Sequence, residues 1–298
     1  MSVLPAQQSD SAVDIIAKVN TLPPLPAVAL QIIDKLGDEF VDGNVIADVV
    51  AQDPAIAGRL IGLANSAFFS LPTPVTDMRQ VVNRVLGADS VRTLAFALAT
   101  QQAFDTSRCA AFDAEGFWSH ALRTAAYCKR LTAVLPKPEQ ATRDNAFILG
   151  LCNSLGLLVL AVIDPQPLND ILAEAEGFDA EQIDRGVTTQ FGTSIASLTA
   201  ALSKHWKMPD AIVATYERYA ESVTDSDEQA QVLMTAASAS KLDFSRDEAD
   251  YVQRSRNDVV HRSATAFEVE ETVVEIALTL TDVEAAALAR NAAAMSGG

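Results

Sequence analysis

The sequence predicts an all-α protein. Hydrophobic residues make up 49% of the 298 residues and aromatic residues only 6%, and alanine-rich runs at 196–201 and 285–289 favour packed helices over sheets. Apolar residues recur at helical spacing, and no part of the second half of the chain alternates as a half-buried strand does. We therefore expect helices packed on helices around a shared core.

The first half of the chain predicts a short helix and then a helical block. The helix is expected at 12–19, and the prolines of Leu22–Pro26 then impose an extended segment because they remove backbone donors. Asp53 and Pro54 predict a helix start, since Asp can accept hydrogen bonds from first-turn amides and Pro loses no bond at the first position. Helices of this block are expected at 28–36, 45–51, 53–65, 81–86 and 91–104.

A second block follows the polar segment 105–108. Residues 147–163 carry no charge, but they contain Asn153 and Ser154 and are shorter than the ~20 residues of a membrane-spanning helix, so two buried helices meeting at a turn are expected. Helices of this block are expected at 114–135, 140–153, 155–163, 168–176, 180–188, 194–206 and 210–220. The acidic stretch 221–228 predicts a linker, and helices at 229–240, 247–254 and 269–294 are expected after it.

Charge and cysteine content exclude several classes of protein. With 22 Lys and Arg against 39 Asp and Glu, the formal net charge of −17 disfavours binding to nucleic acid or to an anionic membrane. The three cysteines, Cys109, Cys128 and Cys152, lack CxxC spacing, which favours small buried side chains in a reducing cytosol. No basic segment followed by an apolar one begins the chain, so we expect no secretory signal and a cytoplasmic protein.

The chain offers little material for catalysis. Its three histidines, His120, His205 and His261, fall in separate helical segments without a local cluster of His, Asp and Glu. Such a distribution is poor for a hydrolytic metal centre, which needs several converging ligands. The motifs GxSxG, GxGxxG and GxxxxGK[ST] are absent. We expect no catalytic residue, no metal and no cofactor, although accidental pairs among the carboxylates cannot be ranked from sequence.

Two further groups of residues have a structural and a functional interpretation. Asn65 and Ser66 end an apolar helix, where Asn tolerates a left-handed cap and Ser bonds local backbone, so capping is favoured over ligand contact. Phe117 and Trp118 open a long helix and are expected to anchor packing between the blocks rather than to hold a ligand.

Over approximately residues 20–220 the chain resembles the HDOD family, the HD-related output domains of bacterial signalling proteins. The resemblance implies a helical lobe packed on a bundle like that of HD phosphohydrolases. It divides the chain into an arm at 1–20, an HDOD domain at 21–220 (lobe 21–108, bundle 109–220) and a helical extension at 221–298. It rests on seven segments in the family's order: Leu22–Pro26, Gln52-Asp53-Pro54, Leu63–Ala67 with Asn65 and Ser66, Leu86-Gly87, Trp118 with His120, Ala146–Leu151 with Gly150, and Trp206–Pro209.

The chain departs from the family's relatives at the metal ligands. Active HD phosphohydrolases read Leu-His-Asp-Ile-Gly where this chain reads Cys152-Asn-Ser-Leu-Gly156, so Asn153 and Ser154 stand at ligand positions. An amide and a hydroxyl are neutral and bind divalent ions weakly. Ile195 and Tyr219-Ala220 stand where many relatives carry histidines, and His120 alone is kept. The resemblance therefore implies the fold without the hydrolysis.

Three interpretations of function remain open. The first is a non-enzymatic signalling scaffold that binds an unidentified signalling protein or a small molecule, in part through a vestigial pocket at His120, Asn153 and Ser154. The second is a metal-dependent phosphohydrolase with an atypical site around His120. The third is a ligand sensor whose output lies in residues 221–298. Residues 269–294 are expected to pack on the bundle or to mediate formation of a homo-oligomer.

Overall fold

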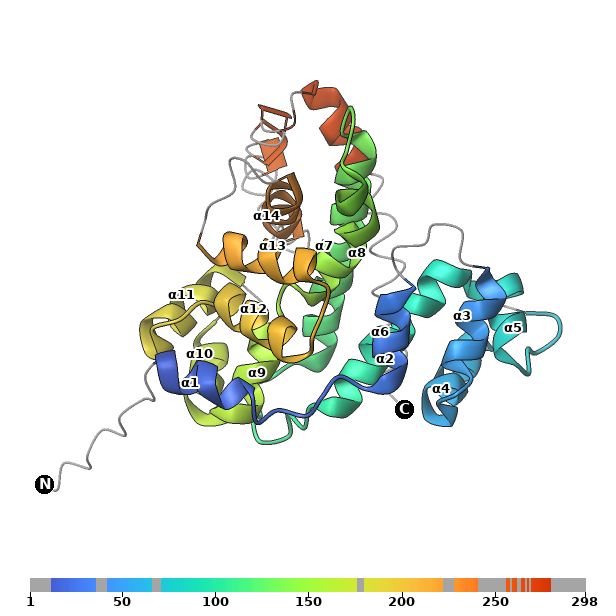
Figure 1. The fold of residues 1–298 in the computed structure, drawn as a ribbon, viewed down its shortest axis with the longest axis horizontal. Coiled ribbons are helices and arrows are strands. Elements are labelled where there is room, and N and C mark those ends of the chain that lie inside the picture. The colour runs from blue at the N-terminus through green and yellow to red at the C-terminus, as the bar shows by residue number, and fades with distance from the viewer. Residues whose placement is uncertain are drawn as a thin grey trace, which may run out of the picture.

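The chain is all-α, which confirms the predicted fold class. A computed structural model describes residues 12–35, 42–65, 71–175, 180–221 and 228–240 and, further on, 256–257, 259–261, 264–265, 267 and 269–279. Its regular elements are all helices, with no strand within these ranges. Figure 1 shows them arranged as a smaller lobe beside a larger bundle. Ser66 and the helix expected at 247–254 lie outside the described residues.

The smaller body, the N-terminal lobe, is one continuous stretch of sequence. Its longest helix, α6, packs against α2, α3 and α4. The lobe comprises α2 (Ala27–Asp34), α3 (Gly43–Val50), α4 (Pro54–Ala64), α5 (Met78–Gln80), the π-helix η1 (Val81–Leu86) and α6 (Ala88–Ala103).

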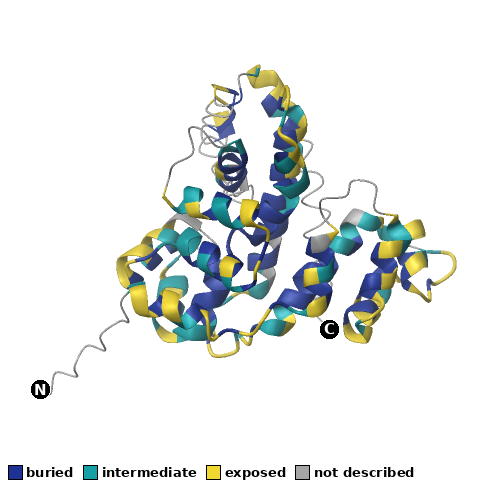
Figure 2. Cartoon of the chain, viewed as in Figure 1, coloured by how far each residue is buried: buried dark blue, intermediate teal, exposed yellow. Residues whose placement is uncertain are grey.

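The larger body, the bundle, is built around α7, which packs against α8 and α14. Figure 2 shows buried residues along the inward faces of these helices. The bundle comprises α1 (Ala12–Val19), α7 (Ala114–Val134), α8 (Gln140–Cys152), α9 (Leu155–Ile163), α10 (Pro165–Glu174), α11 (Ala180–Phe191), α12 (Ile195–His205), α13 (Asp210–Ala220) and α14 (Glu228–Ser240).

Helix α1 belongs to the bundle although it precedes the lobe in sequence. It contacts α9 and α12, and its Ile15 and Val19 are buried. The chain then crosses to α2 through the proline-rich segment Leu22–Pro26, which we call the strap. In Figure 1 the strap runs along the lower edge from α1 to α2. The predicted N-terminal arm thus contains a helix packed on the bundle.

Short-range signals set the helix starts as the sequence predicts. The Asp53 carboxylate accepts hydrogen bonds from the amides of Ala55 and Ile56 at 2.9 and 3.1 Å, and Pro54 is the first residue of α4. Asp77 accepts from Gln80 in the same way. Such caps stabilise a helix by about 1 kcal/mol each because they satisfy amides that have no partner inside the helix.

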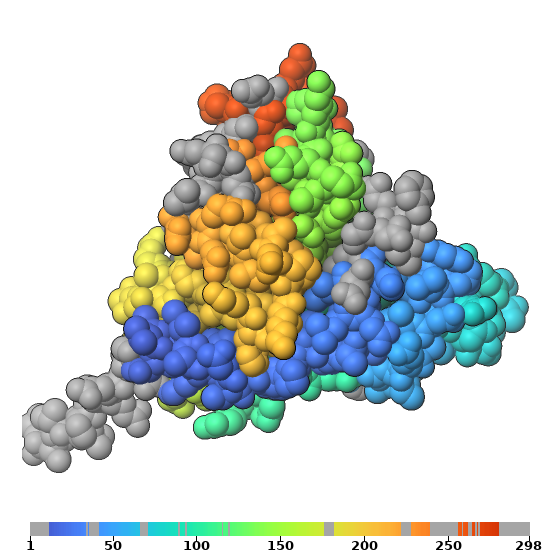
Figure 3. Space-filling view, viewed as in Figure 1, coloured from blue at the N-terminus to red at the C-terminus, as the bar shows by residue number. Residues whose placement is uncertain are grey.

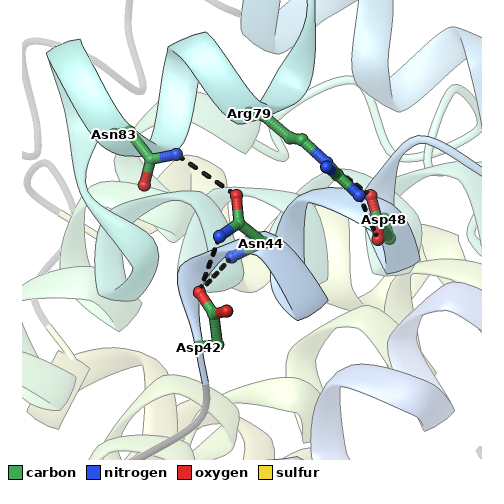
Figure 4. A network of polar contacts seen from close by, with 5 residues as sticks. All are labelled: Asp42, Asn44, Asp48, Arg79 and Asn83. Atoms are coloured by element: carbon green, nitrogen blue, oxygen red, sulfur yellow. Dashed lines mark hydrogen bonds and ion pairs between the residues drawn. The ribbon is translucent and has the colours of Figure 1, made fainter.

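Within the lobe, an exposed polar network joins α3 to α5 and η1 (Figure 4). The Arg79 guanidinium donates to both carboxylate oxygens of Asp48, at 3.1 and 2.9 Å. Asn83 donates to Asn44, whose own amide groups donate to Asp42. The Arg79–Asp48 pair is more than half exposed, so solvent screens it and it contributes little to stability.

The charge-free stretch forms two buried helices that meet at a turn, as predicted. An 18-residue window within residues 140–163 has the length and composition of a membrane span, but 83% of that window is buried. The Asn153–Ser154 turn divides the stretch into α8 and α9. Burial of this kind is typical of core helices in globular proteins.

The C-terminal part contacts the bundle through α14. The Glu228 carboxylate accepts a hydrogen bond from the Glu139 amide at the start of α8, at 2.8 Å, and Gln229 accepts from Asn145 at 3.3 Å. Further on, the guanidinium of the buried Arg256 donates to Glu275 at 2.8 Å. The contacts of Glu228 and Gln229 join the end of the predicted acidic linker to α8, whereas the Arg256–Glu275 pair lies wholly after that linker.

All three cysteines are free and buried, as predicted. Burial raises the pKa of the Cys128 and Cys152 thiols far above the ordinary value, and it also raises the pKa of Cys109. A protonated, inaccessible thiol is a poor nucleophile and a poor metal ligand, so the cysteines act as core side chains.

Candidate functional site

The candidate site is centred on the turn between α8 and α9. Asn153 and Ser154 form this turn and are 8% and 7% exposed. Ser154 is the residue before α9, but its side chain makes no capping hydrogen bond. The carboxamide oxygen of Asn153 is buried and has no hydrogen-bond partner among the described protein groups. A buried acceptor without a protein donor can accept a hydrogen bond from a water molecule or from a ligand.

Close packing of α7 and α8 brings His120 to the level of this turn. At Gly150 the helices touch backbone to backbone, because a Cβ there would lie 2.5 Å from Ala125 Cα and 2.6 Å from the Thr124 oxygen. The two helices form an antiparallel hairpin. One turn toward the N-terminus of α7 and one turn toward the C-terminus of α8 therefore lead in the same direction. His120, one turn before Thr124, therefore lies level with Asn153 and Ser154, and it is 8% exposed.

Thr199 on α12 holds the turn in place, a role that sequence reasoning missed. Its hydroxyl oxygen accepts a hydrogen bond from the Gly156 amide at 2.9 Å. Its proton faces the carbonyl oxygens of Asn153 and Ile195, at 3.1 and 2.9 Å. Gly156 permits this approach, since a Cβ there would collide with the Ile195 carbonyl oxygen. A threonine within a helix gives no sequence signal for such a contact.

The other two positions at which relatives carry histidines gather around Asp184 of α11. The Asp184 carboxylate accepts a hydrogen bond from the Ile195 amide at 3.2 Å. Burial, together with the negative charge of Asp184, raises the pKa of Tyr219 to about 12. Tyr219 is therefore a neutral hydroxyl at physiological pH. Sequence reasoning had not singled out Asp184.

The side chains of the described residues bear on whether this site could hold a divalent metal ion. Among the described residues, no group of three or more His, Cys, Asp and Glu side chains is placed to hold an ion. Asn153 and Ser154 are neutral. Tyr219, which stands where many relatives carry a histidine, is a protonated phenol. Neutral oxygen donors compensate poorly for the hydration shell that a divalent ion loses. The α8–α9 turn thus offers two neutral polar residues, and Asp184 is the carboxylate beside the positions of Ile195 and Tyr219.

Most of the remaining motif residues build the fold. Trp118 stacks edge-on against Phe117, with ring centroids 5.0 Å apart, and Phe117 also contacts Phe112. These contacts join Phe117 and Trp118 to Phe112, which lies in the segment between α6 and α7, and the anchoring of one block on the other stays a prediction. Pro209 precedes α13 as its cap residue, and Trp206 caps the end of α12.

Asn65 has a structural role, though not the one expected. It ends α4 with φ −88°, outside the left-handed region, so the predicted left-handed cap is wrong. Its side chain instead pairs with the backbone of Val75: the Val75 amide donates to Oδ1 and Nδ2 donates to the Val75 oxygen, both at 2.8 Å. The carboxamide thus closes the loop that follows α4.

Replacing Asn65 with aspartate or alanine is expected to destabilise the lobe. Aspartate cannot donate to the Val75 oxygen and alanine loses both hydrogen bonds, at a cost of about 1–3 kcal/mol. Urea unfolding followed by circular dichroism measures this loss. Asn83→Ala is the matched control, because Asn83 is exposed and has one long hydrogen bond, at 3.3 Å. Equal midpoints for Asn65→Ala and Asn83→Ala would contradict the assignment.

Comparison with known proteins matches the chain to one domain family and to several solved structures of the same fold. A sequence model of the HDOD domain matches residues 22–222. An uncharacterised protein of Treponema pallidum (strain Nichols) is 24% identical over 255 residues, which cover 84% of this chain and 48% of that protein. The chain thus spans about half the length of this curated relative.

Three solved structures share the fold. A candidate signal transduction protein of Marinobacter aquaeolei VT8 has a TM-score of 0.69 at 22% identity, covering 99% of this chain and 63% of that one. An HDOD domain protein of unknown function from Geobacter sulfurreducens has a TM-score of 0.63 at 22% identity, covering 93% and 95%. A candidate phosphohydrolase of Shewanella amazonensis SB2B has a TM-score of 0.65 at 21% identity, covering 93% and 97%.

Proposed function

This chain belongs to the HDOD domain family, and on that premise we propose that it is a non-enzymatic signalling domain that serves as a scaffold for a protein partner or a small ligand. The observation that carries the proposal is the set of polar side chains at the α8–α9 turn. Asn153 and Ser154 stand where HD phosphohydrolases carry a His-Asp pair, and the side-chain Oδ1 of Asn153 is buried without a protein donor. A neutral, acceptor-bearing turn suits recognition of a hydrogen-bond donor better than it suits a cation.

The overall charge supports the same conclusion. A net charge of −17 disfavours the approach of anionic phosphoesters, which are the substrates of HD phosphohydrolases. The resemblance in fold to a candidate signal transduction protein is consistent with a signalling role, while the resemblance to a candidate phosphohydrolase makes hydrolysis the alternative to be tested. In this proposal the bundle retains the architecture of the phosphohydrolases, and the site binds without turning over a substrate.

The metal content of the purified protein tests this proposal. Protein purified without added metal or chelator is expected to hold less than about 0.1 ion per chain by elemental mass spectrometry, because neutral side chains stand at the α8–α9 turn where HD phosphohydrolases carry a His-Asp pair. Hydrolysis of bis(p-nitrophenyl) phosphate with added Mn²⁺ should be the same for the wild type and for His120→Ala. The matched control is His261→Ala, since His261 lies on the surface in an ion pair with Glu271.

Two results would overturn the proposal. One is a near-stoichiometric metal ion that is present in the wild type and His261→Ala but lost in His120→Ala. The other is phosphodiester hydrolysis that His120→Ala abolishes. Either result would establish the phosphohydrolase alternative, with His120 as a ligand of an atypical centre.

A further inference from the structure

The lobe and the bundle are two bodies with little helix packing between them. Helices α2 to α6 pack against one another, and α1 and α7 to α14 pack against one another. In the described part of the chain, no helix of one body packs extensively against a helix of the other. The chain crosses between the bodies at the strap and again at residues 104–113, between α6 and α7. Bodies joined so sparsely move relative to each other unless specific contacts hold them.

Both crossings meet at Trp206, the residue that ends α12. Its indole Nε1 donates to the Pro23 carbonyl oxygen of the strap at 3.1 Å. The same ring packs edge-on against Phe104, the first residue after α6, with centroids 5.7 Å apart and planes at 60°. Trp206 and Phe104 are both buried. One side chain of the bundle thus contacts each segment by which the lobe is attached.

His205, the preceding residue, adds a second hydrogen bond to the strap. Its Nε2 lies 3.0 Å from the Leu22 carbonyl oxygen, and because a carbonyl only accepts, Nε2 is the donor. Leu22 and Leu25 of the strap are buried, at 5% and 4% exposure. In Figure 3 the strap lies against the end of α12 along the lower edge of the molecule. The strap is therefore held at two successive carbonyl groups.

The end of α12 is shaped to present these two side chains. The Met208 amide donates to the Ser203 oxygen and the Lys207 amide to the Lys204 oxygen, both at 3.0 Å, which is the Schellman pattern. It places Lys207 at φ 54°, in the left-handed region that a side chain with a Cβ disfavours. This Schellman end stops α12 at His205 and so fixes where Trp206 leaves the helix.

The second crossing is anchored separately at its bundle end. The Ala111 amide donates to the Asn169 side chain of α10 at 2.8 Å. Fixing Ala111 to α10 leaves residues 105–110 between that anchor and the Phe104–Trp206 contact. Rotation of the lobe about this crossing therefore depends on whether Trp206 keeps its contacts.

We propose that His205 and Trp206 form a latch that fixes the orientation of the N-terminal lobe on the bundle, and that opening the latch lets the lobe swing about its two crossings. Two hydrogen bonds and one aromatic pair hold it closed. A binding event that separates the strap from α12 removes both hydrogen bonds together and leaves only the aromatic pair with Phe104. The latch is independent of ligand binding at the α8–α9 turn, so it holds whether or not the proposed function does.

Distances between spin labels on the two bodies test the latch. Labels are attached at Arg59→Cys on α4 and Glu217→Cys on α13, both exposed positions, and measured by pulsed electron paramagnetic resonance. The three native cysteines are buried, so the labels react at the introduced sites. The latch is weakened by Trp206→Phe, which keeps the ring and removes the donor, and by His205→Leu. The matched control is Trp118→Phe, which alters the other tryptophan inside the bundle.

The wild type and Trp118→Phe are expected to give one narrow distance distribution. The double variant His205→Leu/Trp206→Phe is expected to give a distribution at least about two-fold broader, because the bodies then lack a fixed orientation. As a single variant, His205→Gln, which restores a donor, should give a narrower distance distribution than the single variant His205→Leu. An unchanged distribution in a double variant that retains wild-type helicity and melts cooperatively would overturn the proposal. If the double variant does not fold, the same comparison is made with Trp206→Phe and His205→Leu singly, and unchanged distributions there would overturn it equally.

Discussion

Replacing Gly150 with alanine is expected to destabilise the protein by about 3 kcal/mol, because the added methyl group meets backbone and not side chain. The new Cβ would lie 2.5 Å from Ala125 Cα and 2.6 Å from the Thr124 oxygen. A side chain could rotate away from such a contact, whereas a helix backbone cannot, so α7 and α8 would have to separate. That separation would also move His120 away from Asn153 and Ser154.

Chemical denaturation of Gly150→Ala measures this loss of stability. Gly58→Ala is the matched control, since Gly58 lies within α4 and a Cβ there meets nothing within 4 Å. That variant should gain about 0.5–1 kcal/mol from the better helix propensity of alanine. Equal unfolding free energies for Gly150→Ala and the wild type would show that α7 and α8 are not in backbone contact.

Replacing Thr199 with valine is expected to cost about 2–3 kcal/mol with almost no change in side-chain shape. Valine leaves the buried Gly156 amide without an acceptor and removes the donor that faces the Asn153 carbonyl. An unsatisfied buried group loses its hydration without compensation, so the cost exceeds that of an average hydrogen bond. The turn that carries Asn153 and Ser154 then loses the hydrogen bond that the Thr199 hydroxyl of α12 donates to the Asn153 carbonyl oxygen.

Two measurements read out this effect. Urea unfolding gives the loss of stability, and amide hydrogen exchange should show faster exchange at Gly156. Thr189→Val is the matched control, because Thr189 is exposed on α11 and its hydroxyl bonds only the Arg185 carbonyl one turn back. That change should stay within about 0.5 kcal/mol. If Thr199→Val exchanged at Gly156 like the wild type, the assigned hydrogen bond would be wrong.

Features that depend on neighbours in the chain could be predicted from the sequence. The helix at 12–19, the start of α4 at Pro54 and the turn between α8 and α9 all follow from caps, prolines and apolar spacing. These signals act within one or two helical turns, so a single sequence contains them completely. The departure of Asn153 and Ser154 from the family pattern likewise identified the turn that proves to be buried.

Features that depend on distant partners could not be predicted. The hydrogen bond of Trp206 to Pro23 joins residues 183 positions apart, and no periodicity records such a contact. Thr199 and Asp184 look like ordinary helix residues in the sequence. Their roles depend on contacts between helices: Thr199 of α12 bonds Gly156 of α9, and Asp184 of α11 bonds Ile195 of α12. Asn65 was misjudged for the same reason: a local rule predicts a left-handed cap, but the Val75 backbone ten residues away offers its side chain a better partner.

The order of the helices has a consequence for synthesis of the chain. The lobe is contiguous, so it can fold as soon as α6 has left the ribosome, whereas α1 must wait for α9 and α12. During that interval the apolar face of Ile15 and Val19 has no partner from the bundle, so α1 is made before the lobe but placed after it. The bundle is therefore a discontinuous domain, and the lobe is inserted between α1 and α7. If the lobe were excised, the two ends of the bundle chain, at the strap and near Phe104, would lie close together beside Trp206.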